Sequence, residues 1–297
     1  MATKSIPVYF DERMVARCAL PSPSPRKPEL VVARWRSLGL PIRIEPVAPV
    51  SRAEFNLAHE RSHVDGIFAG TTANGFGTHD REVMDSLAWT SGSMLSAARA
   101  ALLSANDPTS LVRGVACSPT SGFHHAGWAQ SWGFCTFNGL MITCRKILLE
   151  GKVKRIGILD CDQHHGDGTE DIITHLGLHG SVEHITARTG YPHNATIFMK
   201  TLPDLLKRFA GCGLLLYQAG ADCHVDDPLG GFLDSAQMRL RDRLVFEHCA
   251  RAGLPVAWNL AGGYQQEERP DGSVSLDKVL ALHDATMEEC IRVFAAA

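Results

Sequence analysis

Runs of apolar residues typical of buried β-strands alternate with stretches of helical spacing along most of the chain. The strand-like runs cover residues 41–50, 111–117, 155–159, 182–187, 213–219 and 255–260. Helical spacing covers residues 29–38, 52–63, 85–104, 140–148, 170–175, 202–209, 235–252 and 276–294. Because parallel strands need crossover connections, which are usually helical, this alternation predicts an α/β fold with a parallel sheet covered on both faces. We expect a single domain over residues 1–297.

Composition and charge narrow the class of protein. With 45% hydrophobic and 21% charged residues, the chain has the composition of an ordinary globular domain. Its formal net charge of −3 offers no general attraction for nucleic acid or anionic lipid, so we expect neither as a partner. Nine cysteines without regular spacing predict reduced thiols and a cytoplasmic location. Charged residues interrupt the first 20 positions, so we expect no signal peptide, and no later stretch has membrane-spanning length.

Acidic and imidazole side chains follow two of the strand-like runs. Asp160, Asp162 and His164 come at the end of one run, and alternation along an extended backbone turns all three to one face. Asp222 follows another run. Because ligands in open α/β folds bind at the carboxyl ends of the strands, we predict that Asp162, His164 and Asp222 bind one divalent cation. Three protein ligands leave a position open, as in catalytic sites, and mixed oxygen and nitrogen ligands suit zinc, iron or manganese.

The alternative for the nearby polar residues is a purely structural role. Asp167 or Thr169 would then cap the helix that follows, and for Thr169 we favour this interpretation. Cys161 and Cys223 are adjacent to the predicted ligands, but neighbours in an extended segment point away from the shared face. We therefore assign both thiols to packing.

Two histidines and one tyrosine add acid–base chemistry to this predicted edge of the sheet. His124 and His125 follow the run at 111–117, and Asp160 and Asp167 are available to hold their rings. A carboxylate on one ring nitrogen fixes the tautomer and leaves the other nitrogen free to transfer a proton. Tandem histidines are often a surface feature, and here a catalytic role is the better interpretation. Tyr264 follows two glycines after the last strand, where its hydroxyl would stabilise a developing oxyanion.

Six blocks of sequence, in order, resemble the histone deacetylase superfamily, which includes bacterial acetylpolyamine amidohydrolases. The blocks are GFHHA at 122–126, GFCTFN at 133–138, DCDQHHGDGT at 160–169, AGADCH at 219–224, DPLG at 227–230 and GGY at 262–264. The resemblance implies an arginase/deacetylase-type three-layer sandwich around a central, mainly parallel sheet of about eight strands. Two stretches depart from the family pattern, the block PTSGF at 119–123 and a compressed segment at 182–194. Both departures affect the depth and floor that the resemblance implies for the acyl pocket.

The resemblance also assigns roles to individual residues. It implies one Zn²⁺ per chain on Asp162, His164 and Asp222, and a potassium ion near Asp160, Asp162, His164 and Thr186. It makes His125, paired with Asp167, the general base and then the general acid. His124, paired with Asp160, becomes an electrostatic partner, and Tyr264 polarises the amide carbonyl. The walls of the acyl-lysine tunnel are expected at Gly133, Phe134 and Tyr191.

These assignments together predict a zinc-dependent amidohydrolase that removes an acyl group from a lysine-like or polyamine nitrogen. The expected partner is a small acylated amine or acyl-lysine substrate, and the sequence leaves homo-oligomerisation open. One alternative is a ureohydrolase-like enzyme with two manganese ions, which would require further carboxylates where this chain has His124, His125 and Tyr264. Another is a catalytically silent module that binds acylated amines, for which at least one catalytic position should be damaged.

Overall fold

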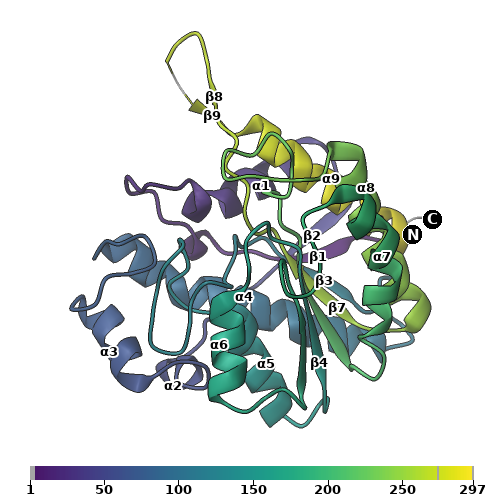
Figure 1. Ribbon diagram of the computed structural model, residues 1–297, viewed down its shortest axis with the longest axis horizontal. Helices are drawn as coiled ribbons and strands as arrows, with labels where there is room; N and C mark the ends of the chain where they lie inside the picture. The colour runs from purple at the N-terminus through teal and green to yellow at the C-terminus, as the bar shows by residue number, and fades with distance from the viewer. Residues whose placement is uncertain (1–3, 273, 296–297) are drawn as a thin grey trace.

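The computed structural model describes residues 4–272 and 274–295 and has three layers, a parallel sheet between two layers of helices (Figure 1). The strands of this sheet are β1 (Ile6–Tyr9), β2 (Ile42–Glu45), β3 (Val115–Ser118), β4 (Ile156–Asp160), β5 (Val182–Ile185), β6 (Leu214–Gln218) and β7 (Val256–Asn259). The α-helices are α1 (Lys27–Ser37), α2 (Arg52–Phe55), α3 (Arg61–Ala69), α4 (Arg81–Ala105), α5 (Gly139–Leu149), α6 (Asp167–His175), α7 (Ala195–Lys207), α8 (Ser235–Ala252) and α9 (Asp277–Phe294). Two 3₁₀ turns, η1 (Glu12–Met14) and η2 (Ser24–Arg26), precede α1.

The order of the strands explains why one edge of the sheet carries the chemistry. The order is β2-β1-β3-β7-β6-β4-β5, and every neighbouring pair is parallel. The four strands that precede the blocks of polar residues, β3, β7, β6 and β4, are therefore consecutive neighbours. Their carboxyl ends lie side by side at one edge, as the sequence predicted.

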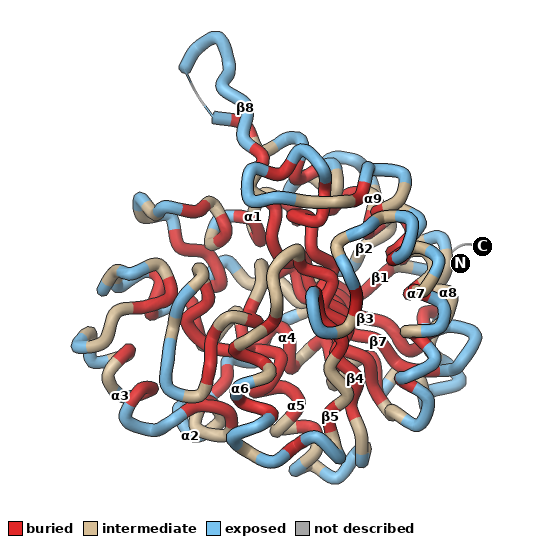
Figure 2. The backbone as a smooth tube through the Cα atoms, in the orientation of Figure 1, coloured by how far each residue is buried: buried red, intermediate tan, exposed pale blue. Residues whose placement is uncertain are grey.

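Alternation of side chains along the strands divides the core into two halves. In β6, Leu215 and Tyr217 pack with α1, α7, α8 and α9, whereas Leu214 and Leu216 face α4, α5 and α6. These strands are buried on both faces, and Figure 2 shows them as the buried centre of the molecule. This is the reason why their sequences read as continuous apolar runs. The predicted α/β sandwich is confirmed.

The strands in the described residues differ from the sequence prediction in three respects. In the described residues the sheet has seven strands, one fewer than the resemblance implied. The apolar runs missed β1, which has only four residues and contains a proline, Pro7, at a position where prolines are rare. They also missed the antiparallel hairpin of β8 (Glu267–Glu268) and β9 (Val274–Ser275), which projects from the body in Figure 1.

The single helix predicted over residues 52–63 is instead two helices, α2 and α3. The buried side chain of His59, between them, holds two other segments of the chain. Its Nδ1 lies 2.8 Å from the carbonyl oxygen of Gly127, and its Nε2 accepts the backbone N–H of Asn138 at 2.9 Å. Because Nε2 is an acceptor, the ring is neutral with its proton on Nδ1. His59 thus fixes the segment that follows the two histidines of the predicted site.

Acid is expected to destabilise the protein through His59. Burial lowers the pKa of His59 to about 3, from 6.5, so the stability that neutral His59 confers is complete above pH 6.5 and is lost as the pH falls towards 3. Each pKa unit corresponds to about 1.4 kcal/mol. Urea unfolding at pH 7, 6, 5 and 4 should show a steeper loss for the wild type than for His59→Gln. Parallel pH dependences for the two proteins would contradict this account.

All nine cysteines are free, and seven of them are buried. Cys161 and Cys223 point into the core, as predicted, and the Cys223 thiol donates to the carbonyl of Cys161 at 3.0 Å. Within residues 4–272 and 274–295, no helix has both the length and the apolar character needed to cross a membrane.

Candidate active site

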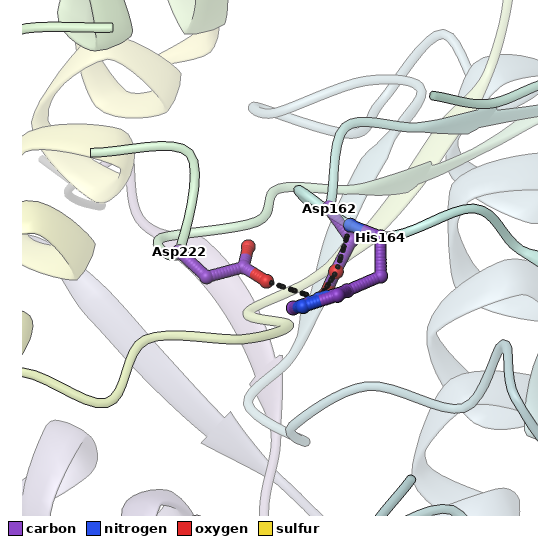
Figure 3. A group of neighbouring side chains, drawn as sticks. All are labelled: Asp162, His164 and Asp222. Carbon is purple, nitrogen blue, oxygen red and sulfur yellow. Dashed lines mark hydrogen bonds and ion pairs between the residues drawn. The ribbon is translucent and has the colours of Figure 1, made fainter. Parts of the chain in front are cut away.

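Asp162, His164 and Asp222 converge from two loops, those after β4 and β6 (Figure 3). Their potential ligand atoms all lie within 4.8 Å of one another. The Nδ1 atom of His164 is 3.0 Å from Oδ1 of Asp162 and 3.1 Å from Oδ2 of Asp222. Backbone N–H groups orient the carboxylates, since Gln163 donates to Asp222 at 3.1 Å and His164 donates to Asp162 at 2.9 Å.

Two glycines allow these loops to approach so closely. A Cβ atom on Gly220 would overlap the backbone of Cys161 and Asp162, and one on Gly262 would overlap the carboxylate of Asp222. Gly262 also has a positive φ of 47°. Larger residues at either position would therefore push the carboxylate-bearing loops apart.

The charges of the cluster fit a divalent cation. Asp162 and Asp222 are both buried. Burial, together with the charge of Asp162, raises the pKa of Asp222 to about 8. Hydrogen bonds to the two carboxylates raise the pKa of His164 to about 10, so in the absence of a metal protons neutralise the site. A cation bound by two carboxylates and one imidazole replaces those protons, and this donor set suits zinc.

His124 and His125 each pair with one carboxylate. Nδ1 of His124 lies 2.7 Å from Asp160, and Nδ1 of His125 lies 2.7 Å from Asp167. The two imidazole rings are 4.2 Å apart between centroids. Nε2 of His124 points towards the metal cluster and lies 3.6 Å from Oδ1 of Asp162. In both residues the carboxylate holds Nδ1 and leaves Nε2 towards the site.

The two histidines differ in charge. Burial alone would lower the pKa of His124, but Asp160 and Asp162 outweigh it and raise this pKa to about 9. For His125 burial dominates, and its pKa falls below 6.5 in spite of the hydrogen bond to Asp167. At neutral pH His124 is therefore cationic and His125 is neutral. Neighbouring groups whose pKa values are pushed apart in this way can take different roles in acid–base chemistry.

Asp160 is buried, and both of its carboxylate oxygens accept hydrogen bonds. One of the donors, Gln218, was not predicted from the sequence. Gln218, at the end of β6, donates from Nε2 to Oδ1 of Asp160 at 2.7 Å. Its other amide atom, Oε1, accepts the N–H of Phe123 at 3.3 Å. Gln218 thus links the histidine segment to Asp160. A polar residue at the end of an otherwise apolar run was the signal that could have identified it.

Asn138 and Thr169 support the histidine segment from the other side. The Asn138 side chain donates to the carbonyl of Ala126 at 3.1 Å and to the hydroxyl of Thr169 at 2.9 Å. Thr169 was expected to cap α6, and this expectation is wrong. The helix begins at Asp167 after Gly166, so Thr169 lies inside its first turn, where its N–H donates to the carbonyl of His124 at 2.9 Å.

Tyr264 follows a turn of unusual backbone conformation after β7. Ala261, Gly262 and Gly263 all have positive φ values, of 53°, 47° and 90°. The turn is held by Lys27, which is fully buried and whose Nζ contacts the carbonyl oxygens of Gly262 and Gly263. Nothing in the sequence identified Lys27, which lies in a proline-rich segment that reads as surface.

The Tyr264 hydroxyl remains protonated at neutral pH, because burial raises the pKa of Tyr264 well above 10. The backbone N–H of Tyr264 donates to Oδ2 of Asp227 at 2.8 Å. The ring centroid lies 5.8 Å from that of Phe134. Tyr264 can therefore offer a hydrogen bond to an oxygen in the site, and it has an aromatic neighbour beside it.

One pocket includes most of the predicted site. Its walls contain the following residues of the prediction: His124, His125, Gly133, Phe134, Asp162, His164 and Tyr264. Phe76 stacks on Phe134, with ring centroids 5.7 Å apart, and extends the aromatic wall. Thr120 and Ser121, from the segment that departs from the family pattern, also line the pocket. Asp160, Asp167 and Asp222 are not part of the wall, but each contacts a histidine that is.

Gly133→Ala is expected to reduce kcat on any substrate by about 10²-fold, because a Cβ atom would lie 2.5 Å from Cδ2 of His125 and displace the ring. Gly77→Ala is the matched control, since Gly77 also has a positive φ, 72° against 57°, but open space around its Cα. Both variants should lose stability in thermal unfolding, and Gly133→Ala should lose more, because only its Cβ atom overlaps another side chain. Equal kcat values for the two variants would contradict the proposed contact.

Tyr191 does not lie where the resemblance placed it. It was expected to line the acyl tunnel, but it is 3% exposed and is not part of the pocket wall. Its ring packs on Phe198 with centroids 4.6 Å apart, and its hydroxyl donates to backbone carbonyls of the metal-binding loop. The compressed segment after β5 turns the side chain beneath the loop and away from the pocket.

Comparisons with known proteins agree with this geometry. The family description "Histone deacetylase domain" matches residues 23–193, more than half of the chain. An uncharacterized protein of Picosynechococcus is 32% identical over 242 residues, which cover 74% of this chain and 78% of that protein. Acetylpolyamine amidohydrolase 1 of Pseudomonas aeruginosa is 31% identical over 182 residues, 51% of this chain and 50% of that enzyme.

A crystal structure of an acetylpolyamine aminohydrolase from Burkholderia pseudomallei superposes with a TM-score of 0.74 at 15% identity. It covers 97% of this chain and 99% of its own, so the similarity establishes the fold. The matched family segment contains both histidines and the first two residues of the metal cluster, and Asp222 and Tyr264 follow beyond it. The chain belongs to the histone deacetylase family.

Proposed function

We propose that this protein is a zinc-dependent amidohydrolase that removes an acyl group, acetyl in the simplest case, from a lysine-like or polyamine nitrogen. The observation that carries the proposal is the placement of His125. This neutral imidazole is held by Asp167 and lies in the same pocket as the Asp162–His164–Asp222 cluster. Family membership and the similarity to acetylpolyamine amidohydrolases support the same reaction class.

Asp162, His164 and Asp222 would hold the zinc ion. When bound, Zn²⁺ lowers the pKa of a water molecule and polarises the carbonyl oxygen of the acyl group. Three protein ligands leave room in a tetrahedral shell for one further ligand, as in catalytic zinc sites. One zinc per chain follows from the single cluster of this kind in the described residues.

The remaining groups would move protons and stabilise charge. Nε2 of His125 accepts a proton from the attacking water, because Nδ1 is engaged by Asp167. His125 then returns the proton to the nitrogen of the departing amine, which leaves as a neutral amine. The hydroxyl of Tyr264 donates a hydrogen bond to the carbonyl oxygen as negative charge develops on it. His124, kept cationic by Asp160, stabilises that charge electrostatically.

The aromatic residues of the pocket wall indicate which substrates the pocket would accept. Phe76, Phe134 and Tyr264 form a continuous series of ring contacts at the pocket, which suits the methylene chain of a lysine or polyamine. Gly133, beside Phe134, keeps this wall close to His125. We also propose that the chain acts as a single catalytic domain, because strands from both halves of the sequence form one sheet. Nine free cysteines support a cytoplasmic location.

A substrate panel tests the proposal. Purified protein is incubated with an acetyl-lysine peptide, acetylputrescine and amides of longer acyl chains, first with zinc and then after treatment with a chelator. We expect hydrolysis of at least one acetyl amide, loss of this activity on chelation and recovery when zinc is restored. Binding of acylated amines without turnover by the zinc-loaded protein would instead identify a silent binding module. Urea release from a guanidinium compound would contradict the proposal.

A further inference from the structure

Two backbone carbonyls of the metal-binding loop accept a hydrogen bond from a buried tyrosine. The hydroxyl of Tyr191 lies 2.8 Å from the carbonyl oxygen of Asp160 and 3.3 Å from that of Asp162. The family resemblance implies a potassium ion near these same residues. In this chain an O–H group presents its positive end to the two oxygens.

Other oxygen atoms of the implied potassium site also have donors within the chain. Oδ1 of Asp160 accepts from the Gln218 side chain at 2.7 Å and from the N–H of Asp162 at 3.2 Å. Oδ2 accepts from His124 at 2.7 Å and from the hydroxyl of Thr186 at 3.4 Å. Each of these oxygens already has a donor within the chain, so a cation would compete with those hydrogen bonds. Because the Tyr191 hydroxyl also lies against both loop carbonyls, the residues present do not fit potassium.

Buried donors satisfy the rest of the loop as well. The carbonyl of Cys161, between the two aspartates, accepts from Nη1 of Arg241 at 3.4 Å, and the same atom donates to the carbonyl of Gly220 at 2.8 Å. Arg241 is completely buried and is paired with Asp242 at 2.8 Å. Three consecutive carbonyls of the loop thus accept hydrogen bonds from the side chains of Tyr191 and Arg241.

The tight turn after β5 is what delivers Tyr191 to this position. The N–H of Gly190 donates to the carbonyl of Thr186 at 2.8 Å, and the N–H of Arg188 donates to that of Tyr191 at 3.0 Å. A Cβ atom on Gly190 would lie 2.7 Å from the side chain of Ile185, so the turn requires glycine. The compression seen in the sequence here shortens the connection and brings the phenol under the loop.

We propose that the Tyr191 hydroxyl takes the place of a monovalent cation beneath the metal-binding loop, and that the protein is independent of potassium. Tyr191 is a positioning residue, because it acts on the zinc ligands through the backbone of their loop. The cation independence of folding stands on this geometry alone, whereas the effect on zinc binding rests on the proposed function.

The test compares melting temperatures of the metal-free wild type in KCl, NaCl and tetramethylammonium chloride at equal ionic strength. We expect identical values in the three salts. A saturable rise in melting temperature with KCl, absent with tetramethylammonium, would overturn the proposal. This comparison needs neither zinc nor substrate, so its result is separate from success or failure of the proposed function.

A pair of variants tests the positioning role. Tyr191→Phe leaves the two carbonyls without their donor. Tyr217→Phe removes another buried tyrosine hydroxyl, which donates to Asp242 and reaches the metal-binding loop only indirectly, through the Asp242–Arg241 pair. Both variants should melt several degrees below the wild type. Only Tyr191→Phe should bind zinc more weakly, about tenfold or more, in competition with a chelator. Equal zinc affinity of the two variants would overturn the role of Tyr191.

Discussion

Replacing His125 with alanine is expected to lower kcat on an acetyl amide by about 10²–10⁴-fold, the usual contribution of a general acid–base group. The residue is placed to receive a proton, because Asp167 holds Nδ1 at 2.7 Å and the ring borders the pocket. Zinc content and melting temperature should change little, since the ring is not among the metal ligands. Steady-state kinetics on the purified variant measures the effect.

His248→Ala provides the control, because His248 is a half-buried histidine on α8 outside the pocket wall. It should retain wild-type kcat. The pH profile adds a second check. Burial lowers the pKa of His125, so the acid limb of kcat/KM should have its midpoint below pH 6.5, with activity rising as the base loses its proton. Turnover of His125→Ala at the wild-type rate would rule out the role assigned to this residue.

Asp222→Asn is expected to abolish both zinc binding and hydrolysis while preserving the fold. It removes one of two buried carboxylates that face His164. In the metal-free wild type, burial raises the pKa of Asp222 to about 8, so the carboxyl is mostly protonated at pH 7. The neutral amide has a similar shape, and the metal-free variant should be at least as stable as the metal-free wild type.

Zinc should then stabilise the wild type but not Asp222→Asn. A ligand at 100 times its Kd adds about 2.7 kcal/mol to the free energy of unfolding. Thermal unfolding with and without zinc should show this increase in the wild type and in Asp226→Asn, an exposed neighbour outside the metal cluster, and not in Asp222→Asn. An equal zinc-dependent shift in Asp222→Asn would place the metal elsewhere.

The sequence was sufficient to predict six of the seven strands of the sheet, β2 to β7, and the convergence of the site. Strands buried on both faces leave continuous apolar runs, and parallel topology brings the residues after β3, β4, β6 and β7 to one edge. The structure accordingly brings together Asp162, His164 and Asp222, and it pairs His124 with Asp160 and His125 with Asp167. Local pattern and topology were enough for the metal cluster, whereas the resemblance supplied the pairing of each histidine with its own aspartate.

Features that depend on tertiary contacts were not predictable in this way. The break between α2 and α3 arises because His59 is used to hold two distant backbone segments. Lys27 has no local signal, since only the folded chain shows that its ammonium contacts the turn before Tyr264. The resemblance misplaced Tyr191 because the turn after β5 is shorter than in the family pattern and directs the ring inwards.

Anomalous diffraction from a zinc-soaked crystal, recorded on both sides of the zinc absorption edge, tests the central claim most directly. The account predicts one zinc peak per chain, bound by Asp162, His164 and Asp222, with Nε2 of His124 and the ring of His125 facing its open side. A peak bound by other residues, or two adjacent metal peaks at this position, would contradict it.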